Sequence, residues 1–116
     1  MNPDTSLKQI GDFRRVYTRG KSAASPRAVV YCRKNRLGRN RTGFTVSKKL
    51  GNAVTRNRVR RRLREIMRLN QSRLQQGFDL IVVARSRAVN TEYSRLEADV
   101  LRCCEQLHLL KKDGTP

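Results

Sequence analysis

The sequence predicts an α/β layer sandwich, in which helices pack against a β-sheet. Two segments, 26–34 and 78–85, have the length of strands and are rich in β-branched and aliphatic residues. Between and after these segments, apolar residues recur every three or four positions, which is the period of an amphipathic helix. Strand and helix patterns thus alternate along a chain of 116 residues, the size of one domain.

The first predicted element is a short helix over about 11–19. Phe13, Val16 and Tyr17 recur at helical spacing in this segment, and they would form its apolar side. Gly20 follows directly and is a candidate C-terminal cap, because glycine commonly ends a helix.

A strand is predicted for PRAVVYCRK at 26–34, with Val29 and Tyr31 on one face. The alternate positions form the other face: Ala28, Val30 and Cys32. The polar segment RLGRNR at 36–41 reads as a turn, and TGFTVSKK at 42–49 as a second strand. We expect a hairpin, because it is the simplest connection between two strands so close in sequence.

The next element is a long helix that begins with RNRVRRRLR at 56–64, six arginines in nine residues. At 100° per residue, one stripe of this helix is apolar and would face the core: Val59, Leu63, Ile66, Met67 and Leu74. A separate arc of about 100° forms one polar and mainly basic face: Asn57, Arg60, Arg61, Arg64 and Arg68. Gly77 is expected to end the helix.

The segment FDLIVVAR at 78–85 is nearly all apolar, as expected for a strand buried on both faces, and completes a β-α-β unit. A C-terminal helix over about 91–109 follows from apolar residues at helical spacing: Tyr93, Leu96, Val100, Cys103 or Cys104, Leu107 and Leu110. The prediction is a single domain over 1–116 with short flexible ends at about 1–6 and 111–116.

Charge narrows the class of partner. Twenty-seven Lys and Arg against nine Asp and Glu give a formal net charge of +18, which favours nucleic acid over other partners. A membrane is the weaker alternative, because no apolar run approaches the roughly 20 residues of a membrane span. The N-terminal residues lack the basic start and apolar stretch of a signal peptide, so a cytoplasmic location is expected.

The cysteines are predicted to be core thiols rather than metal ligands. Cys32, Cys103 and Cys104 lack the C-x-x-C spacing of zinc sites, and the single histidine, His108, does not complete a ligand set. A metal-dependent nuclease would need clustered carboxylates, and a metal-free one commonly uses histidine. We therefore expect no metal site, no organic cofactor and no catalytic residue in the protein itself.

The arginine cluster points to RNA. Only Glu65 lies among its neighbours from Lys48 to Gln76, so intramolecular pairing cannot neutralise the cluster, and arginines at (i, i+4) spacing repel one another. Guanidinium groups bind phosphate oxygens in bidentate fashion.

One alternative is that the arginines form a solvated face that only keeps the protein soluble. A DNA reader is less favoured, because a recognition helix carries varied side chains for base edges. Phe13, Tyr17 and Tyr31 could stack on single-stranded bases, although all three could also be core.

Several motifs occur in a fixed order: DF-x-x-V-Y-x-x-G at 12–20, an aliphatic strand that contains Tyr31, SKKLGNAVTRNRVRRRLRE at 47–65, and DLIVVAR at 79–85. Together they resemble the protein subunit of bacterial ribonuclease P over nearly the whole chain. The resemblance implies a fold of order αβββαβα, similar to a domain of a small-subunit ribosomal protein, with a left-handed β-α-β crossover. It also implies a first short strand near Ser22 to Ala24.

The resemblance further implies an RNA-binding, cytoplasmic ribonucleoprotein subunit that assists a catalytic RNA in removing the 5′ leader of precursor tRNA. The RNA would carry out the phosphodiester hydrolysis with Mg²⁺. By position, the residues that contact the catalytic RNA would be Lys48, Lys49, Asn52, Arg56, Asn57, Arg58, Arg60, Arg61, Arg64 and Arg68. A cleft between the first helix and the sheet would hold the single-stranded leader through Phe13, Tyr17, Val29, Tyr31 and Arg85. The alternatives are a ribosome-associated structural protein and an autonomous endoribonuclease.

Overall fold

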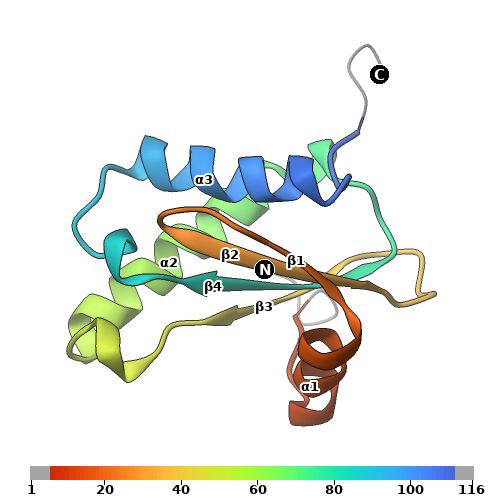
Figure 1. The fold of residues 1–116 in the computed structure, drawn as a ribbon, viewed down its shortest axis with the longest axis horizontal. Coiled ribbons are helices and arrows are strands. Elements are labelled where there is room, and N and C mark those ends of the chain that lie inside the picture. Colours follow the sequence, from red (N-terminus) through yellow and green to blue (C-terminus); the bar gives the residue numbers. More distant parts are fainter. Residues whose placement is uncertain (1–5, 112–116) are drawn as a thin grey trace.

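The computed structural model describes residues 6–111. Its elements follow the expected order αβββαβα. The helices are α1 (Ile10–Arg19), α2 (Ala53–Leu69) and α3 (Tyr93–Gln106). The strands are β1 (Lys21–Ala24), β2 (Ala28–Lys34), β3 (Arg41–Thr45) and β4 (Phe78–Ala84). The α/β layer sandwich is confirmed: α2 and α3 cover one face of the sheet, and the short α1 crosses part of the other (Figure 1).

The expected hairpin between the second and third strands is wrong. The sheet order is β1-β2-β4-β3, so β4 lies between β2 and β3. β4 pairs antiparallel with β2 and parallel with β3, and the latter pairing confirms the β-α-β unit. The physical reason is that β4 has the most continuous apolar sequence. A strand buried on both faces is most stable at the centre of a sheet.

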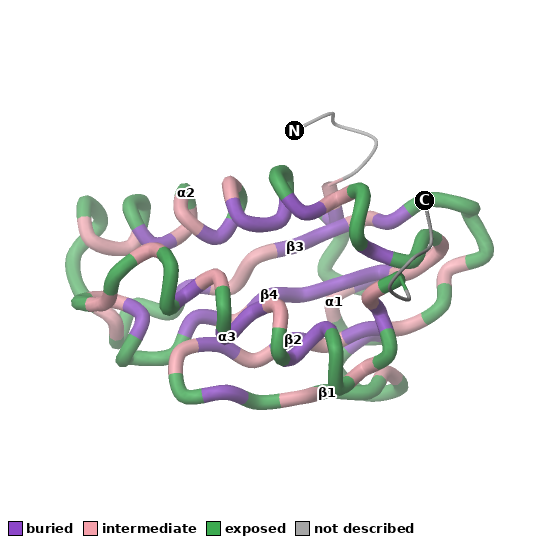
Figure 2. The backbone as a smooth tube through the Cα atoms, turned by 90° about the horizontal axis from the view of Figure 1, so that it is seen from above, coloured by how far each residue is buried: buried purple, intermediate pink, exposed green. Residues whose placement is uncertain are grey.

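The main core is formed by residues of the sheet and of the two helices α2 and α3, and Figure 2 marks the buried segments of these elements. The predicted alternation of β2 is confirmed, because Ala28, Val30 and Cys32 are buried in this core. All three cysteines are free and buried, as predicted for core thiols. Burial raises the pKa of the Cys104 thiol to about 12, so it stays protonated at neutral pH.

The arginine helix ends earlier than predicted. It stops at Leu69, and Asn70 follows with its side-chain amide donating to the carbonyl oxygen of Ile66 at 2.8 Å. Leu74 is buried beyond the helix rather than within it. Gly77 lies in the turn directly before β4 and has φ 101°. Its carbonyl oxygen accepts a hydrogen bond from the backbone N–H of Asn35. Gly77 therefore marks the turn into β4 and not the end of the helix.

The remaining elements agree with their predictions apart from their ends. α1 is capped by Gly20, and β1 lies where the family resemblance placed a short strand. α3 stops at Gln106, before the predicted residue 109, and His108 adopts a positive φ of 58° just beyond it. The expected flexible ends fall mostly on 1–5 and 112–116, outside the described residues. Within residues 6–111, none of the helices has the length and apolar character needed to cross a bilayer.

Candidate RNA-binding surfaces

The loop that leads into the arginine helix is held by local hydrogen bonds. The Oδ1 atom of Asn52 accepts from the backbone N–H of Thr55 at 2.9 Å and caps the helix. Asn52 was predicted to contact RNA, and its side-chain oxygen has this local role. Lys48 and Lys49 form a short 3₁₀ turn before the cap, and both side chains are exposed. Two cations therefore lie next to the positive end of the helix dipole.

The predicted polar and basic face of α2 lies at the surface, and we call it the arginine face: Asn57, Arg60, Arg61, Arg64 and Arg68. Only Arg60 is partly buried, and its guanidinium donates to the Oδ1 atom of Asn57 at 2.9 Å. Arg68 pairs with Glu65 at 2.5 Å, and the hydrogen bond between them lowers the pKa of the Glu65 carboxyl. The uncompensated positive charge is therefore concentrated on the N-terminal part of the face.

Three other arginines of α2 bind backbone carbonyl groups. Arg56 donates to Gly51 at 3.1 Å, within the loop before the helix. Arg58 donates to Val89 at 3.0 Å and Arg62 to Thr91 at 2.8 Å, which ties the helix to the loop after β4. The family resemblance assigned Arg56 and Arg58 to RNA. Arg62 was given no role, because helical periodicity does not reveal contacts between distant segments.

On the other face of the sheet, α1 packs through a small apolar cluster. Val16 and Ile81 are both fully buried there, and Phe13 packs against the cluster. The ring of Phe13 lies on Gly43 of β3, where a Cβ atom would come within 2.4 Å of the ring Cζ. Gly43 therefore sets how closely α1 approaches the sheet.

Beside this contact the sheet presents an aromatic surface: Phe13, Tyr17, Val29, Tyr31, Thr45 and Val83. Tyr17 is 38% exposed, and its ring meets that of Tyr31 edge to face with centroids 4.8 Å apart. The hydroxyl groups of Tyr17 and Thr45 are hydrogen-bonded at 2.8 Å. Val83 pairs with Val29 on β2 and with Thr45 on β3. The four predicted residues Phe13, Tyr17, Val29 and Tyr31 thus lie on the α1 side of the sheet.

Sequence reasoning missed Thr45 and Val83. The period of two along a strand places Val83 on the same face as Ile81, so this residue could have been found. Thr45 could not, because it joins the surface only when β3 pairs with β4. Arg85, the fifth predicted leader residue, is exposed at the end of β4, and its guanidinium donates to the carbonyl oxygen of Ser25 at 3.0 Å.

A buried ion-pair network fixes the N-terminal half of α1. The guanidinium of Arg41 donates to both carboxylate oxygens of Asp79, at 2.8 and 2.7 Å, and lies 3.6 Å from Asp12 on α1. Burial alone would raise the pKa of Asp79, but hydrogen bonds from Arg41 and Asn35 and the charge of Arg41 hold it below its usual value. The carboxylate therefore stays ionised at neutral pH.

The two surfaces meet at the edge of the sheet. A pocket of about 250 Å³ is lined by Phe13 of α1, by Phe44 of β3, and by Arg60 and Arg64 of the arginine face. Guanidinium groups and aromatic rings that share one pocket suit a nucleic-acid strand, which offers phosphates and flat bases. Single-stranded and folded RNA could therefore lie side by side on this protein.

Comparison with known proteins identifies the family of this chain. The family model described as Ribonuclease P matches residues 1–108. The ribonuclease P protein component of Natranaerobius thermophilus is 43% identical over 113 residues, covering 97% of this chain and 98% of its own. That of Alkaliphilus oremlandii is 44% identical over 106 residues, covering 91% and 88%.

Solved structures show the same fold. The Staphylococcus aureus RNase P protein, at 32% identity, has a TM-score of 0.85 over 92% of this chain and 98% of its own. The Thermotoga maritima RNase P protein, at 31% identity, has a TM-score of 0.78 over 84% and 92%. The chain therefore belongs to the ribonuclease P protein family, whose bacterial members work with an RNA subunit in the holoenzyme that cleaves precursor tRNA at its 5′ end.

Proposed function

We propose that the aromatic surface binds the single-stranded 5′ leader of precursor tRNA, while the arginine face and the loop from Lys48 to Asn52 bind the catalytic RNA. The observation that carries this assignment is the edge-to-face pair of the exposed Tyr17 and the half-buried Tyr31, beside a helix with six arginines between 56 and 64. Exposed aromatic rings stack on unpaired bases, and guanidinium groups pair with phosphates. Arg85, at the end of β4, would bind a leader phosphate.

In this proposal the protein contributes binding and charge, and the chemistry belongs to the RNA. The RNA subunit would use Mg²⁺ for phosphodiester hydrolysis, and the protein would need no organic cofactor. The arginine face would screen the repulsion between the two RNA molecules and so help the site to retain its metal ions. Because mature tRNA lacks the leader, contacts on the aromatic surface would favour substrate over product. We place this function in the cytoplasm.

The first test is multiple-turnover cleavage of a precursor tRNA at limiting Mg²⁺, with catalytic RNA alone, protein alone and both together. We expect efficient cleavage at the mature 5′ end only in the mixture. If the protein added nothing, a ribosome-associated role would be favoured instead. The protein-alone reaction is informative because one S. aureus relative is described as a mutant with defective mRNA degradation activity. Cleavage in that reaction would overturn the division of labour proposed here.

A pair of variants separates the two surfaces. Tyr31→Ala should weaken binding of precursor tRNA and leave binding of mature tRNA unchanged, because it removes one stacking ring worth about 1–3 kcal/mol per base. Arg61→Ala should weaken binding of the catalytic RNA. Arg61 is chosen over Arg60 and Arg64, because those two line the pocket that contains Phe13. If each variant lost the same affinity for precursor tRNA and for the catalytic RNA, the assignment would be contradicted.

A further inference from the structure

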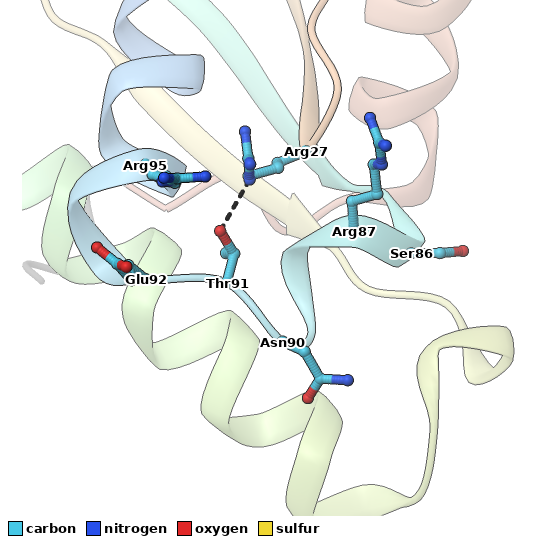
Figure 3. A pocket seen from close by; sticks show the side chains of 7 residues that line it. All are labelled: Arg27, Ser86, Arg87, Asn90, Thr91, Glu92 and Arg95. Carbon is cyan, nitrogen blue, oxygen red and sulfur yellow. Dashed lines mark hydrogen bonds between the residues drawn. The ribbon is translucent and has the colours of Figure 1, made fainter.

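A second pocket opens where β4 leads into α3, and neither RNA surface described above includes its arginines (Figure 3). It has a volume of about 500 Å³, and we call it the basic pocket. Its walls come from the start of β2, the turn after β4 and the first turn of α3. They contribute the side chains of Arg27, Arg87, Asn90, Thr91, Glu92 and Arg95. Three guanidinium groups against one carboxylate give the lining a net positive charge.

One of these arginines is fixed in place. The Nε atom of Arg27 donates to the hydroxyl of Thr91 at 2.8 Å, as the dashed line in Figure 3 marks. A terminal nitrogen of the same guanidinium pairs with the buried carboxylate of Asp99 at 3.2 Å, and the backbone N–H of Arg27 donates to Asp99 at 3.0 Å. The charge of Arg27 is therefore largely compensated, and its planar group forms a rigid wall of the pocket.

The other two arginines are exposed and uncompensated. Among residues 6–111, the guanidinium groups of Arg87 and Arg95 take part in no hydrogen bond or ion pair. Arg95 lies in the first turn of α3, where the helix dipole disfavours a cation, and its guanidinium points toward Arg27 (Figure 3). The guanidinium groups that line the pocket repel one another. An anion between them would offset that repulsion and pair with several N–H donors at once.

The basic pocket is tied to the arginine helix. Arg58 and Arg62 of α2 donate to the carbonyl oxygens of Val89 and Thr91, in the loop that lines the pocket. Figure 1 shows that α2 and α3, which supplies part of the pocket lining, both cover the face of the sheet opposite α1. A folded RNA that lies on the arginine face could extend to the pocket.

We propose that the basic pocket binds a backbone phosphate of the catalytic RNA through Arg87 and Arg95, with Arg27 as the fixed wall. This makes a third RNA contact, separate from the arginine face and from the aromatic surface. The proposal rests on the assignment of the arginine face to the catalytic RNA. A leader phosphate is the competing source of the same chemistry, and the experiment below distinguishes the two.

The test is the double variant Arg87→Gln/Arg95→Gln in the full-length protein. Its affinity for the catalytic RNA should fall about tenfold at low salt, because two exposed ion-pair contacts are lost. The slope of log affinity against log salt concentration should become shallower by about 0.7–0.9, the change expected for the loss of one phosphate contact. The preference for precursor over mature tRNA should be unchanged.

The matched control is Arg102→Gln, which removes one charge from the exposed side of α3 outside the pocket. It should change the salt slope less than either Arg87→Gln or Arg95→Gln alone. Thermal unfolding should show that all variants fold, because neither pocket arginine has a side-chain partner to lose among the described residues. Unchanged affinity and slope for the double variant would overturn the proposal, and so would a loss confined to precursor tRNA.

The variant Arg61→Gln separates this result from the function proposed above. If Arg61→Gln weakens binding of the catalytic RNA and the double variant does not, only the basic pocket is refuted. If neither weakens it, the arginine face is misassigned as well, and the proposal for the pocket fails with it.

Discussion

At the residue scale, two buried polar groups differ in their hydrogen bonding: the Asp79 carboxylate has partners and the Tyr93 hydroxyl has none among the described residues. Asp79 is 7% exposed and is held by Arg41 and Asn35, so its charge has partners on two sides. The hydroxyl of Tyr93 is buried and has no hydrogen-bond partner among residues 6–111. A buried charge with good partners stabilises one arrangement of the chain, whereas a buried hydroxyl without one costs free energy.

Asp79 should make stability depend on acid pH. Its pKa is lower in the folded protein than in the unfolded chain, so its contribution is present above about pH 4 and is lost as the pH falls through the folded value. Asp79→Asn should therefore lower the free energy of unfolding by about 2 kcal/mol at pH 7. Urea unfolding at pH 7 and at lower pH should show the difference from wild type shrinking below about pH 4. A difference that stays constant would refute the role of the charge.

Tyr93→Phe should leave stability unchanged or raise it by about 1 kcal/mol, because it removes the unpaired hydroxyl and keeps the ring. Tyr17→Phe is the matched control. It loses the hydrogen bond to Thr45 and should cost about 0.5–1 kcal/mol. Thermal unfolding of both variants checks the pair, and a loss of stability in Tyr93→Phe would mean that the hydroxyl has a partner in solution.

At the scale of the elements, the position of α1 determines the aromatic surface. The helix rests on the sheet through Val16 and Ile81, and the Asp12–Arg41–Asp79 network fixes one half of it. Phe13 fills the space above Gly43, where no side chain could fit without displacing the ring. Small changes on β3 should therefore move an entire helix and, with it, Tyr17.

Gly43→Ala should lower the free energy of unfolding by about 1–3 kcal/mol, because the added methyl group overlaps the Phe13 ring. It should also weaken binding of precursor tRNA more than binding of mature tRNA. Gly11→Ala is the control within α1: its Cβ would meet nothing within 4 Å, and stability should rise by about 0.5–1 kcal/mol. If Gly43→Ala left both stability and precursor binding intact, α1 would not position the leader surface.

At the scale of the whole molecule, charge dominates. A formal net charge of +18 on 116 residues attracts RNA and raises its local concentration near the protein. Most of the acidic residues that the structure describes form ion pairs within the protein, such as those of Asp12, Asp79 and Asp99 with arginines. The exposed cations are therefore available to phosphates.

Binding to the catalytic RNA should depend steeply on salt. With about six phosphate contacts and a slope of roughly −0.7 per contact, affinity should fall about 10²- to 10³-fold between 50 and 200 mM monovalent salt. Filter binding or fluorescence titration across that range measures the slope. A flat response would show that the arginine face is not an electrostatic RNA-binding surface.

Local patterns were enough to predict most of the elements and the kind of partner. The alternation in 26–34 placed Val29 and Tyr31 on one face, the arginine spacing placed the basic face, and the motif at 47–65 indicated the family. These signals depend on residues close in sequence, whose geometry is set by the period of a strand or a helix.

Only the tertiary structure decided which distant segments meet. The insertion of β4 between β2 and β3, which replaced the expected hairpin, brings Thr45 beside Val83 and within hydrogen-bonding distance of Tyr17. The contacts of Arg58 and Arg62 with the loop after β4 likewise join residues about thirty positions apart. Such contacts depend on the competition among strands for the centre of the sheet and on side-chain packing, and no local period encodes either.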